Sequence, residues 1–238
     1  MSIRFEVLDS RPSAMGEISL RRRYDEEAGA EVYEVKLGEE YLMSSLFPVA
    51  EIELARLGLA RTPGTGLDVI VGGLGLGYTA QAALEDTRLR AVTVVEYSEA
   101  VIDWHRKELI PDTEGLAADP LVHLLKSDFF AAAMGDGSFH PGEPDRRYDA
   151  ILLDIDHTPR HVLHEPHTAF YTVEGLRGAA AKLREGGCFA MWSDDPADDE
   201  FMAALAEVFT DVENREIWFD NPYTGGQSSN SVYLATKA

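Results

Sequence analysis

The first 45 residues alternate apolar and polar positions, which is the pattern of strands in a sheet with one exposed face. Turn-prone segments, RPSAMG (11–16) and DEEAGA (25–30), separate the alternating runs. The predicted strands are IRFEVLDS (3–10), GEISLRRRY (16–24) and AEVYEVKL (30–37), with LGEEYLMSS (37–45) as a short fourth. A few antiparallel strands are not stable alone, so we predict a small β-domain over residues 1–45 that packs on the rest of the chain.

Beyond residue 45 the pattern changes to helical spacing and then to buried apolar runs. A linking helix is predicted within residues 46–66, and strands alternate with helices from residue 67 onward. The predicted strands are LDVIVGG (67–73), RAVTVVEY (90–97), LVHLLKSD (121–128), YDAILLDI (148–155), CFAMWSDD (188–195), VENREIWFD (212–220) and SSNSVYLAT (228–236). The predicted helices are GYTAQAALED (77–86), SEAVIDWHRKEL (98–109), FFAAAMG (129–135), TVEGLRGAAAKLREGG (172–187, ending on glycine) and DEFMAALAEVFT (199–210). This alternation predicts an α/β fold, a Rossmann-like, doubly wound, mostly parallel sheet with an antiparallel edge, over residues 46–238.

Charge and composition narrow the classes of function. The chain has 42 acidic residues against 21 Lys and Arg, a net charge of −21, which repels nucleic acid and anionic membrane surfaces. No apolar run approaches the roughly 20 residues that span a bilayer, and the N-terminus lacks the apolar core of a signal peptide. The single cysteine, Cys188, excludes an internal disulfide. We expect a cytoplasmic protein that binds neither nucleic acid nor membranes.

Three consecutive strand ends carry the residues of a nucleoside site. Ligands of such sheets bind beyond the carboxyl ends of the strands, and the first of these ends carries Gly73-x-Gly75-x-Gly77 before a helix. Glu96 ends the second strand, where a carboxylate accepts hydrogen bonds from a ribose diol. Asp128 ends the third, placed to accept from an adenine amino group, with Phe129 or Phe130 alongside the base. We predict a bound nucleoside.

This pattern resembles the S-adenosylmethionine-dependent methyltransferase superfamily and, within it, the spermidine/spermine synthase family. The narrower likeness covers the small β-domain, the linking helix, the glycine loop, VTVVEYSEAVIDWHR and YDAILLDIDHTP. It implies decarboxylated S-adenosylmethionine as donor, a polyamine acceptor, and aminopropyl transfer between them.

Three departures from the family pattern bear on that reading. The family usually has G-G-G-D-G, whose aspartate holds the donor ammonium, and Gly75 stands at that position. Its Tyr-His pair falls about where this chain has Met43 and Ser44, and its D-x-x-D spacing has become Asp154-x-Asp156. A glycine loop without the aspartate is also what ordinary methyltransferases show.

The segment LLDIDHTPRHVLHEPH (152–167) ends the fourth predicted strand and holds the candidate catalytic groups. Transfer from a sulfonium is an in-line displacement that needs an aligned, unprotonated nucleophile. Asp154 and Asp156 are the candidates for holding an ammonium and taking its proton, and His157 is the alternative base.

Four histidines in this segment, His157, His161, His164 and His167, also suggest a metal site. Prolines 159 and 166 interrupt any continuous helix, and no cysteine is near. We therefore expect no metal and interpret the segment as a loop that covers the substrate.

Further candidates for an acceptor pocket follow the last strands. Asp194 and Asp195 come after the fifth strand, and Tyr223 and Gln227 lie between the last two. The small-molecule acceptor is predicted to be an amine or a polyamine; a homodimer is left open.

Two other functions fit the same residues. One is a methyltransferase that uses S-adenosylmethionine on a small acceptor, and the other is a nucleoside-binding homologue without catalysis. Comparing the binding of S-adenosylmethionine and its decarboxylated form distinguishes methyl transfer from aminopropyl transfer.

Overall fold

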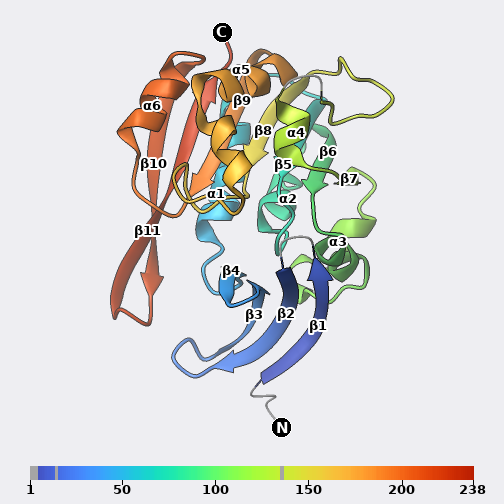
Figure 1. Cartoon of the computed structure of the whole chain (residues 1–238), viewed down its shortest axis with the longest axis vertical. Helices are drawn as coiled ribbons and strands as arrows, with labels where there is room; N and C mark the ends of the chain where they lie inside the picture. Colours follow the sequence, from blue (N-terminus) through green and yellow to red (C-terminus); the bar gives the residue numbers. More distant parts are fainter. Residues whose placement is uncertain (1–4, 14–15, 135–136) are drawn as a thin grey trace.

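The computed structural model describes residues 5–13, 16–134 and 137–238 and shows two sheets, one above the other in Figure 1. The smaller is antiparallel, with strands in the order β1-β2-β3-β4. Its strands are β1 (Phe5–Ser13), β2 (Gly16–Asp25), β3 (Ala30–Leu37) and β4 (Glu40–Ser44). The predicted fourth strand is confirmed. The turn predicted over residues 11–16 is too long, because Pro12 still pairs with Glu17 in the ladder; residues 14 and 15 lie outside the described part of the chain.

The larger sheet has seven strands in the order β10-β11-β9-β8-β5-β6-β7. They are β5 (Leu67–Gly72), β6 (Leu89–Glu96), β7 (Val122–Lys126), β8 (Tyr148–Leu153), β9 (Leu183–Ser193), β10 (Thr210–Asn221) and β11 (Gly226–Thr236). The ladders from β7 through β6, β5 and β8 to β9 are parallel, whereas β11 runs antiparallel to β9 and β10 antiparallel to β11. The predicted doubly wound sheet with an antiparallel edge is confirmed, with its switch point beside β5.

Helices cover both faces of the larger sheet and create two apolar cores. On one face lie α1 (Val49–Arg61), α2 (Tyr78–Ala83) and α3 (Glu99–Arg106), and this core also takes in side chains of β2 and β3. On the other face lie α4 (Phe129–Ala133), α5 (Val173–Lys182) and α6 (Asp199–Ala206). Short 3-10 turns cover Pro111–Thr113, Leu116–Ala118 and Glu165–Tyr171. The smaller sheet therefore shares a core with the larger one, as its few strands require.

The predicted helices are longer than those in the described part of the chain: helices 77–86, 98–109 and 199–210, for example, are observed as α2, α3 and α6 with the shorter bounds given above. The linking helix is confined to Val49–Arg61, between Pro48 and Pro63, each of which disfavours helix at the residue before it. The helix predicted over residues 172–187 ends at Lys182, because Leu183 already pairs with Tyr148 as β9 begins. Part of predicted helix 129–135 lies outside the described residues, and α4 ends at Ala133.

No helix in the described part of the chain is long and apolar enough to cross a lipid bilayer.

Candidate functional site

A cavity of about 230 Å³ lies at the carboxyl ends of β5, β6, β7 and β8. One side of the cavity is formed by the predicted strand ends. The opposite side is formed by side chains of β2, β3 and β4 in the smaller sheet. Its lining residues are Ile18, Val35, Leu42, Met43, Gly73, Gly75, Val95, Glu96, Tyr97, Ser98, Val101, Asp128, Phe129, Phe130, Asp154, Ile155, Leu163, His164 and His167. The site thus forms where the two sheets meet.

The glycine loop brings the backbone close to the neighbouring strand end. Gly73 has φ +92°, and a Cβ there would lie 2.0 Å from the carbonyl oxygen of Asp154. Gly77 has φ +91° and precedes α2 without lining the cavity; a Cβ there would meet the His105 ring at 2.7 Å. Both positions require glycine for conformation and for space.

Gly75 is held against the smaller sheet. Its φ is +49°, and a Cβ would lie 2.7 Å from the sulfur of Met43. Its carbonyl oxygen is 2.9 Å from Nε2 of buried His105, whose pKa is lowered by burial. Met43 therefore fills the space into which a side chain at position 75 would extend.

The two acids predicted to bind a nucleoside both line the cavity. Glu96 accepts from the N–H of Ser98 at 2.6 Å and from that of Leu74 at 3.0 Å, and burial raises the pKa of its carboxyl group. Asp128 caps α4 by accepting from the N–H of Ala131 at 3.1 Å. The glycine loop and the two acids converge on one cavity, and their contacts with ribose and adenine stay predictions.

Two aromatic rings form the wall beside Asp128. Phe129 is buried, stacks on Phe139 with ring centroids 5.3 Å apart, and lies against Gly72, where a Cβ would be 2.7 Å from it. Phe130 stacks on His167 with centroids 3.9 Å apart. Both side chains contribute to the cavity lining.

Asp154 and Asp156 have different surroundings. Asp154 lines the cavity and accepts from the hydroxyl of Thr79 at 2.7 Å, while burial raises the pKa of Asp154 to about 6. Asp156 does not line the cavity; it is buried and accepts from the N–H of Leu163 at 2.8 Å, His167 Nδ1 at 3.0 Å and the Tyr171 hydroxyl at 2.8 Å. Asp156 therefore organises the loop that follows β8, and Asp154 is the aspartate that faces the cavity.

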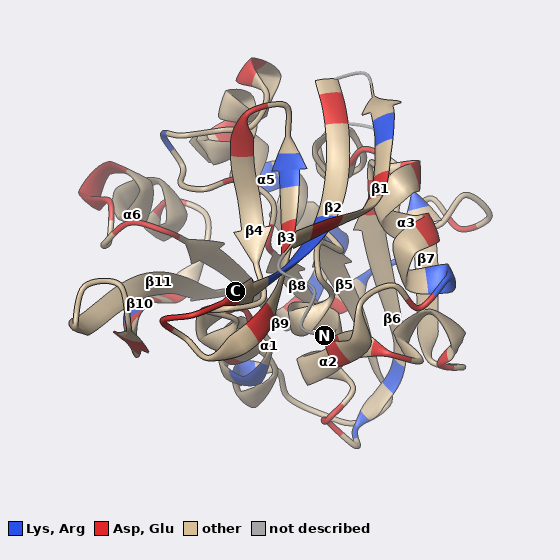
Figure 2. Cartoon of the chain, turned by 90° about the horizontal axis from the view of Figure 1, so that it is seen from below, with Lys and Arg blue, Asp and Glu red and all other residues tan. Residues whose placement is uncertain are grey.

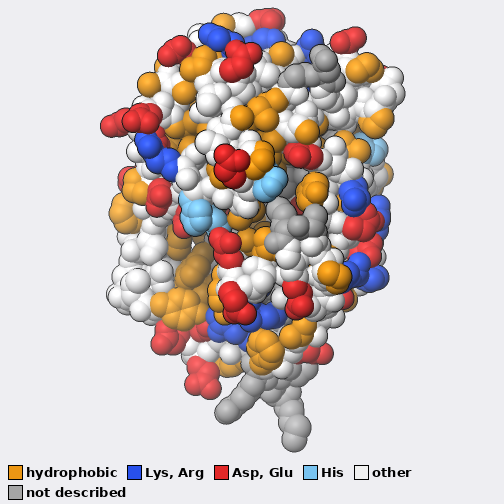
Figure 3. Space-filling model, viewed as in Figure 1, with side chains coloured by type: hydrophobic (Ala, Val, Ile, Leu, Met, Phe, Trp, Pro, Cys, Tyr) orange, Lys and Arg blue, Asp and Glu red, His pale blue; other side chains and the backbone are white. Residues whose placement is uncertain are grey.

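The four histidines separate into two pairs. His157 and His161 face Glu40 of β4, with Nε2 of His157 3.5 Å from its carboxylate, and neither lines the cavity. His164 and His167 do line it. Histidine and acidic side chains lie close together at the middle of the face in Figure 3. No group of three or more His, Cys, Asp or Glu side chains in residues 5–13, 16–134 and 137–238 is arranged to hold a metal ion.

The acceptor-pocket candidates lie outside the cavity. Asp194 and Asp195 are exposed at the end of β9, and Asp194 accepts from Asn230 Nδ2 at 2.8 Å. Tyr223 donates to Asp25 of the smaller sheet, and Gln227 donates to Asp220 at 3.2 Å. Their roles toward an acceptor stay predictions.

Glu51, on the first turn of α1, was not predicted from the sequence. Its Oε2 atom is buried with no hydrogen-bond partner among the described residues. Burial, with the nearby charges of Asp154 and Asp194, raises the pKa of Glu51 to about 8. Acids are common in the first turn of helices, so its position alone carried no functional signal.

Together, the doubly wound sheet and the cavity at its strand ends, lined by Gly73, Gly75 and the acids Glu96, Asp128 and Asp154, define a Rossmann-like α/β domain with a candidate ligand site. Two solved structures share this fold across 98% of the chain: spermidine synthase from Thermotoga maritima (TM-score 0.68, 19% identity, 72% of that chain) and a spermidine synthase in complex with the transition state analogue AdoDATO (TM-score 0.70, 20% identity, 74% of that chain). At these identities the likeness shows the fold.

Curated relatives carry a related name. Polyamine aminopropyltransferase 2 of Hyperthermus butylicus is 29% identical over 149 residues, which cover 60% of this chain and 45% of that protein. Polyamine aminopropyltransferase of Corynebacterium efficiens is 33% identical over 133 residues, or 55% of this chain and 22% of that protein. The chain thus spans less than half the length of these relatives, and no family model matches it. The resemblance to the spermidine synthase family is confirmed in fold and in sequence similarity.

Proposed function

We propose that this chain transfers an aminopropyl group from decarboxylated S-adenosylmethionine to an amine acceptor. The observation that carries the proposal is the charge of the cavity. Its lining includes Glu96, Asp128 and Asp154, and none of its described lining residues is Lys or Arg. Both candidate donors carry a sulfonium and an ammonium group, and such a lining favours the decarboxylated one, which has the higher net positive charge because it lacks the carboxylate. The names of the relatives and the AdoDATO complex of the structural neighbour support the same donor.

The chemistry assigns a distinct task to each part of the site. Glu96 and Asp128 would orient the nucleoside, which fixes the sulfonium near Asp154. The acceptor nitrogen attacks the aminopropyl carbon bonded to sulfur, a C–N bond forms and the C–S bond breaks, and 5′-methylthioadenosine leaves as a neutral thioether. Asp154, with its pKa near 6, is mostly ionised at neutral pH. It can therefore take the proton that the new ammonium loses.

Calorimetry with the two donors tests this function. We expect decarboxylated S-adenosylmethionine to bind more tightly than S-adenosylmethionine, by about tenfold or more, because the acids of the cavity repel the carboxylate that only S-adenosylmethionine carries. We also expect 5′-methylthioadenosine to form when 1,4-diaminobutane is added. A preference for the carboxylated donor would overturn the proposal, and binding without turnover on a panel of amines would indicate a non-catalytic homologue.

A methyltransferase remains the second candidate because of Gly75. Gly75 has no side chain, and Met43 occupies the adjacent space, so the donor tail meets no carboxylate at this position of the glycine loop. Tighter binding of S-adenosylmethionine, with methyl transfer to a small acceptor, is the result that favours this activity.

A further inference from the structure

One acidic group that does not line the cavity, but is connected through Thr79 to the cavity-lining Asp154, has no role in the chemistry above. Glu51 lies on α1, which packs against α2, β8 and β9. Its Oε2 atom is shielded from solvent and has no hydrogen-bond partner in the described chain. A carboxylate oxygen in that condition loses its hydration without compensation, so it normally has a partner in the functional state.

Thr79 connects Glu51 to the cavity-facing aspartate. Its hydroxyl oxygen lies 2.7 Å from Asp154 Oδ2 and 3.2 Å from the backbone carbonyl oxygen of Glu51. The first turn of α1 therefore lies beside the end of β8. Asp194, at the end of β9, also acts on Glu51 through its charge. Glu51 is therefore close enough to feel the charge of an acid in the cavity, Asp154, and of an exposed acid, Asp194.

The remaining groups around Glu51 do not neutralise it. The titratable groups that act on it or feel its charge are Asp154 on β8, Asp194 on β9 and Tyr78 on α2. Burial, together with the hydrogen bond that Tyr78 donates to Asp112, raises the pKa of Tyr78 above its ordinary range, so it is a neutral phenol. Three acids and a phenol attract a cation from outside the protein.

We propose that Glu51 binds an ammonium group of the amine acceptor, with Asp154 facing the nitrogen that attacks and Asp194 marking the entrance. The inference rests on the proposed function for the identity of the acceptor. A primary ammonium has three donors, which match the unpartnered oxygen of Glu51 and its neighbours. Glu51 is thereby a specificity-determining residue for diamines and longer polyamines, which carry a second cationic nitrogen.

Proton release gives the proposal a second signature. With its pKa near 8, Glu51 is mostly protonated at pH 7 before the amine arrives. A bound ammonium favours the carboxylate, so the pKa falls and a proton is released. Amine affinity therefore rises as pH increases from 7 toward 8, above the range in which Asp154 titrates, and this rise disappears when Glu51 cannot ionise.

The test compares Glu51→Gln with Glu53→Gln, the same change two residues along α1 at a site that is paired with Arg56. Calorimetry with 1,4-diaminobutane and 5′-methylthioadenosine is run in two buffers that differ in ionisation enthalpy. We expect the wild type and Glu53→Gln to bind the diamine with proton release at pH 7. Glu51→Gln should bind about tenfold or more weakly, without proton release, because a charge-assisted contact is lost.

Equal diamine affinity in folded Glu51→Gln and wild type, or no diamine binding by the wild type, overturns the inference. A thermal melt establishes that each variant is folded. The transfer assay is read separately: a wild type that binds the diamine through Glu51 but forms no 5′-methylthioadenosine contradicts the proposed function and leaves the Glu51 site standing. Normal transfer with unchanged acceptor KM in Glu51→Gln contradicts the Glu51 site alone.

Discussion

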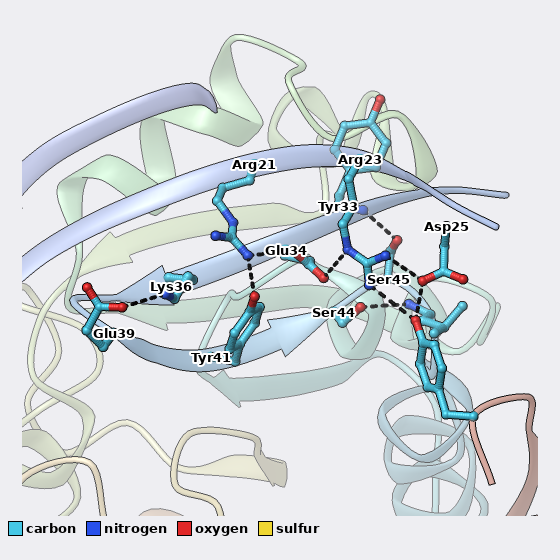
Figure 4. A network of polar contacts seen from close by, with 12 residues as sticks. Arg21, Arg23, Asp25, Tyr33, Glu34, Lys36, Glu39, Tyr41, Ser44 and Ser45 are labelled. Atoms are coloured by element: carbon cyan, nitrogen blue, oxygen red, sulfur yellow. Dashed lines mark hydrogen bonds and ion pairs between the residues drawn. The ribbon is translucent and has the colours of Figure 1, made fainter. Parts of the chain in front are cut away.

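The smaller sheet and the cavity next to it both contain acids that burial affects. The acids of the sheet pair with arginine, whereas those near the cavity do not. In the smaller sheet, Glu34 accepts from Arg21 at 2.8 Å and from Arg23 at 2.7 Å, and basic and acidic positions lie side by side on β2 and β3 (Figures 2 and 4). Hydrogen bonds from Tyr223, from the N–H of Ala28 and from Arg23 hold the pKa of Asp25 below its ordinary range. These acids are satisfied within the fold.

Near the cavity, no Lys or Arg of the described residues shifts the pKa of the corresponding acids. Glu51, Glu96 and Asp154 are half-buried, and this burial raises the pKa of each. An acid paired with arginine is satisfied within the fold. An acid that burial desolvates without a cationic partner lowers the stability of the fold, and we expect such an acid to pair with a cationic group of a ligand. Each substitution below changes either an acid near the cavity or an acid of the smaller sheet with its partners.

Asp154→Asn should have the largest effect. The amide keeps an acceptor for Thr79 but cannot take a proton, so kcat should fall about 100-fold or more. Donor affinity should also fall, by a smaller factor, because one of the negative charges that face the cationic donor is lost. For the wild type, kcat should rise with pH through about 6, because Asp154 is active as the carboxylate, and this dependence should vanish in the variant. Transfer assays from pH 5 to 9 measure both effects. If Asp156→Asn lowers kcat more than Asp154→Asn does, the buried loop aspartate is the base instead.

Glu34→Gln should have the next largest effect, on stability. It leaves two guanidinium groups of β2 facing a neutral amide, and we expect a loss of about 1–3 kcal/mol in the free energy of unfolding. Urea denaturation measures it, with Glu31→Gln on the same strand, at an exposed position, as the control. Equal stabilities of the two variants would show that the arginine pairs contribute nothing beyond surface charge.

The sequence predicts the fold and the floor of the site well because both follow from local patterns. Apolar runs identify the parallel strands, and the rule that ligands bind at their carboxyl ends leads to Gly73, Glu96, Asp128 and Asp154, all of which line one cavity. The strands of the smaller sheet are equally visible as alternation.

The parts that the sequence does not predict depend on tertiary packing. Asp154 and Asp156 would share a face if the strand continued, but β8 ends at Leu153 and the backbone turns, so only Asp154 reaches the cavity. Met43 and Glu51 matter through contacts with Gly75 and Thr79, which are 32 and 28 residues away along the chain. No spacing in the sequence encodes such contacts.

Tyr223→Phe should have the smallest effect. It tests whether the hydrogen bond to Asp25 contributes to the stability of the smaller sheet. The Tyr223 hydroxyl donates to Asp25 and accepts from Arg23 at 3.2 Å, which ties the β10–β11 hairpin to the smaller sheet. Its removal should cost about 0.5–1.5 kcal/mol at pH 7, measured by urea denaturation against Tyr24→Phe on β2. Because the folded pKa of Asp25 is depressed, the stability it contributes is present above its ordinary pKa of 3.8 and is lost as pH falls below it. The difference between Tyr223→Phe and the wild type should therefore shrink below about pH 4. A difference that does not depend on pH would mean that Tyr223 acts through ring packing on Phe47 rather than through the charge of Asp25.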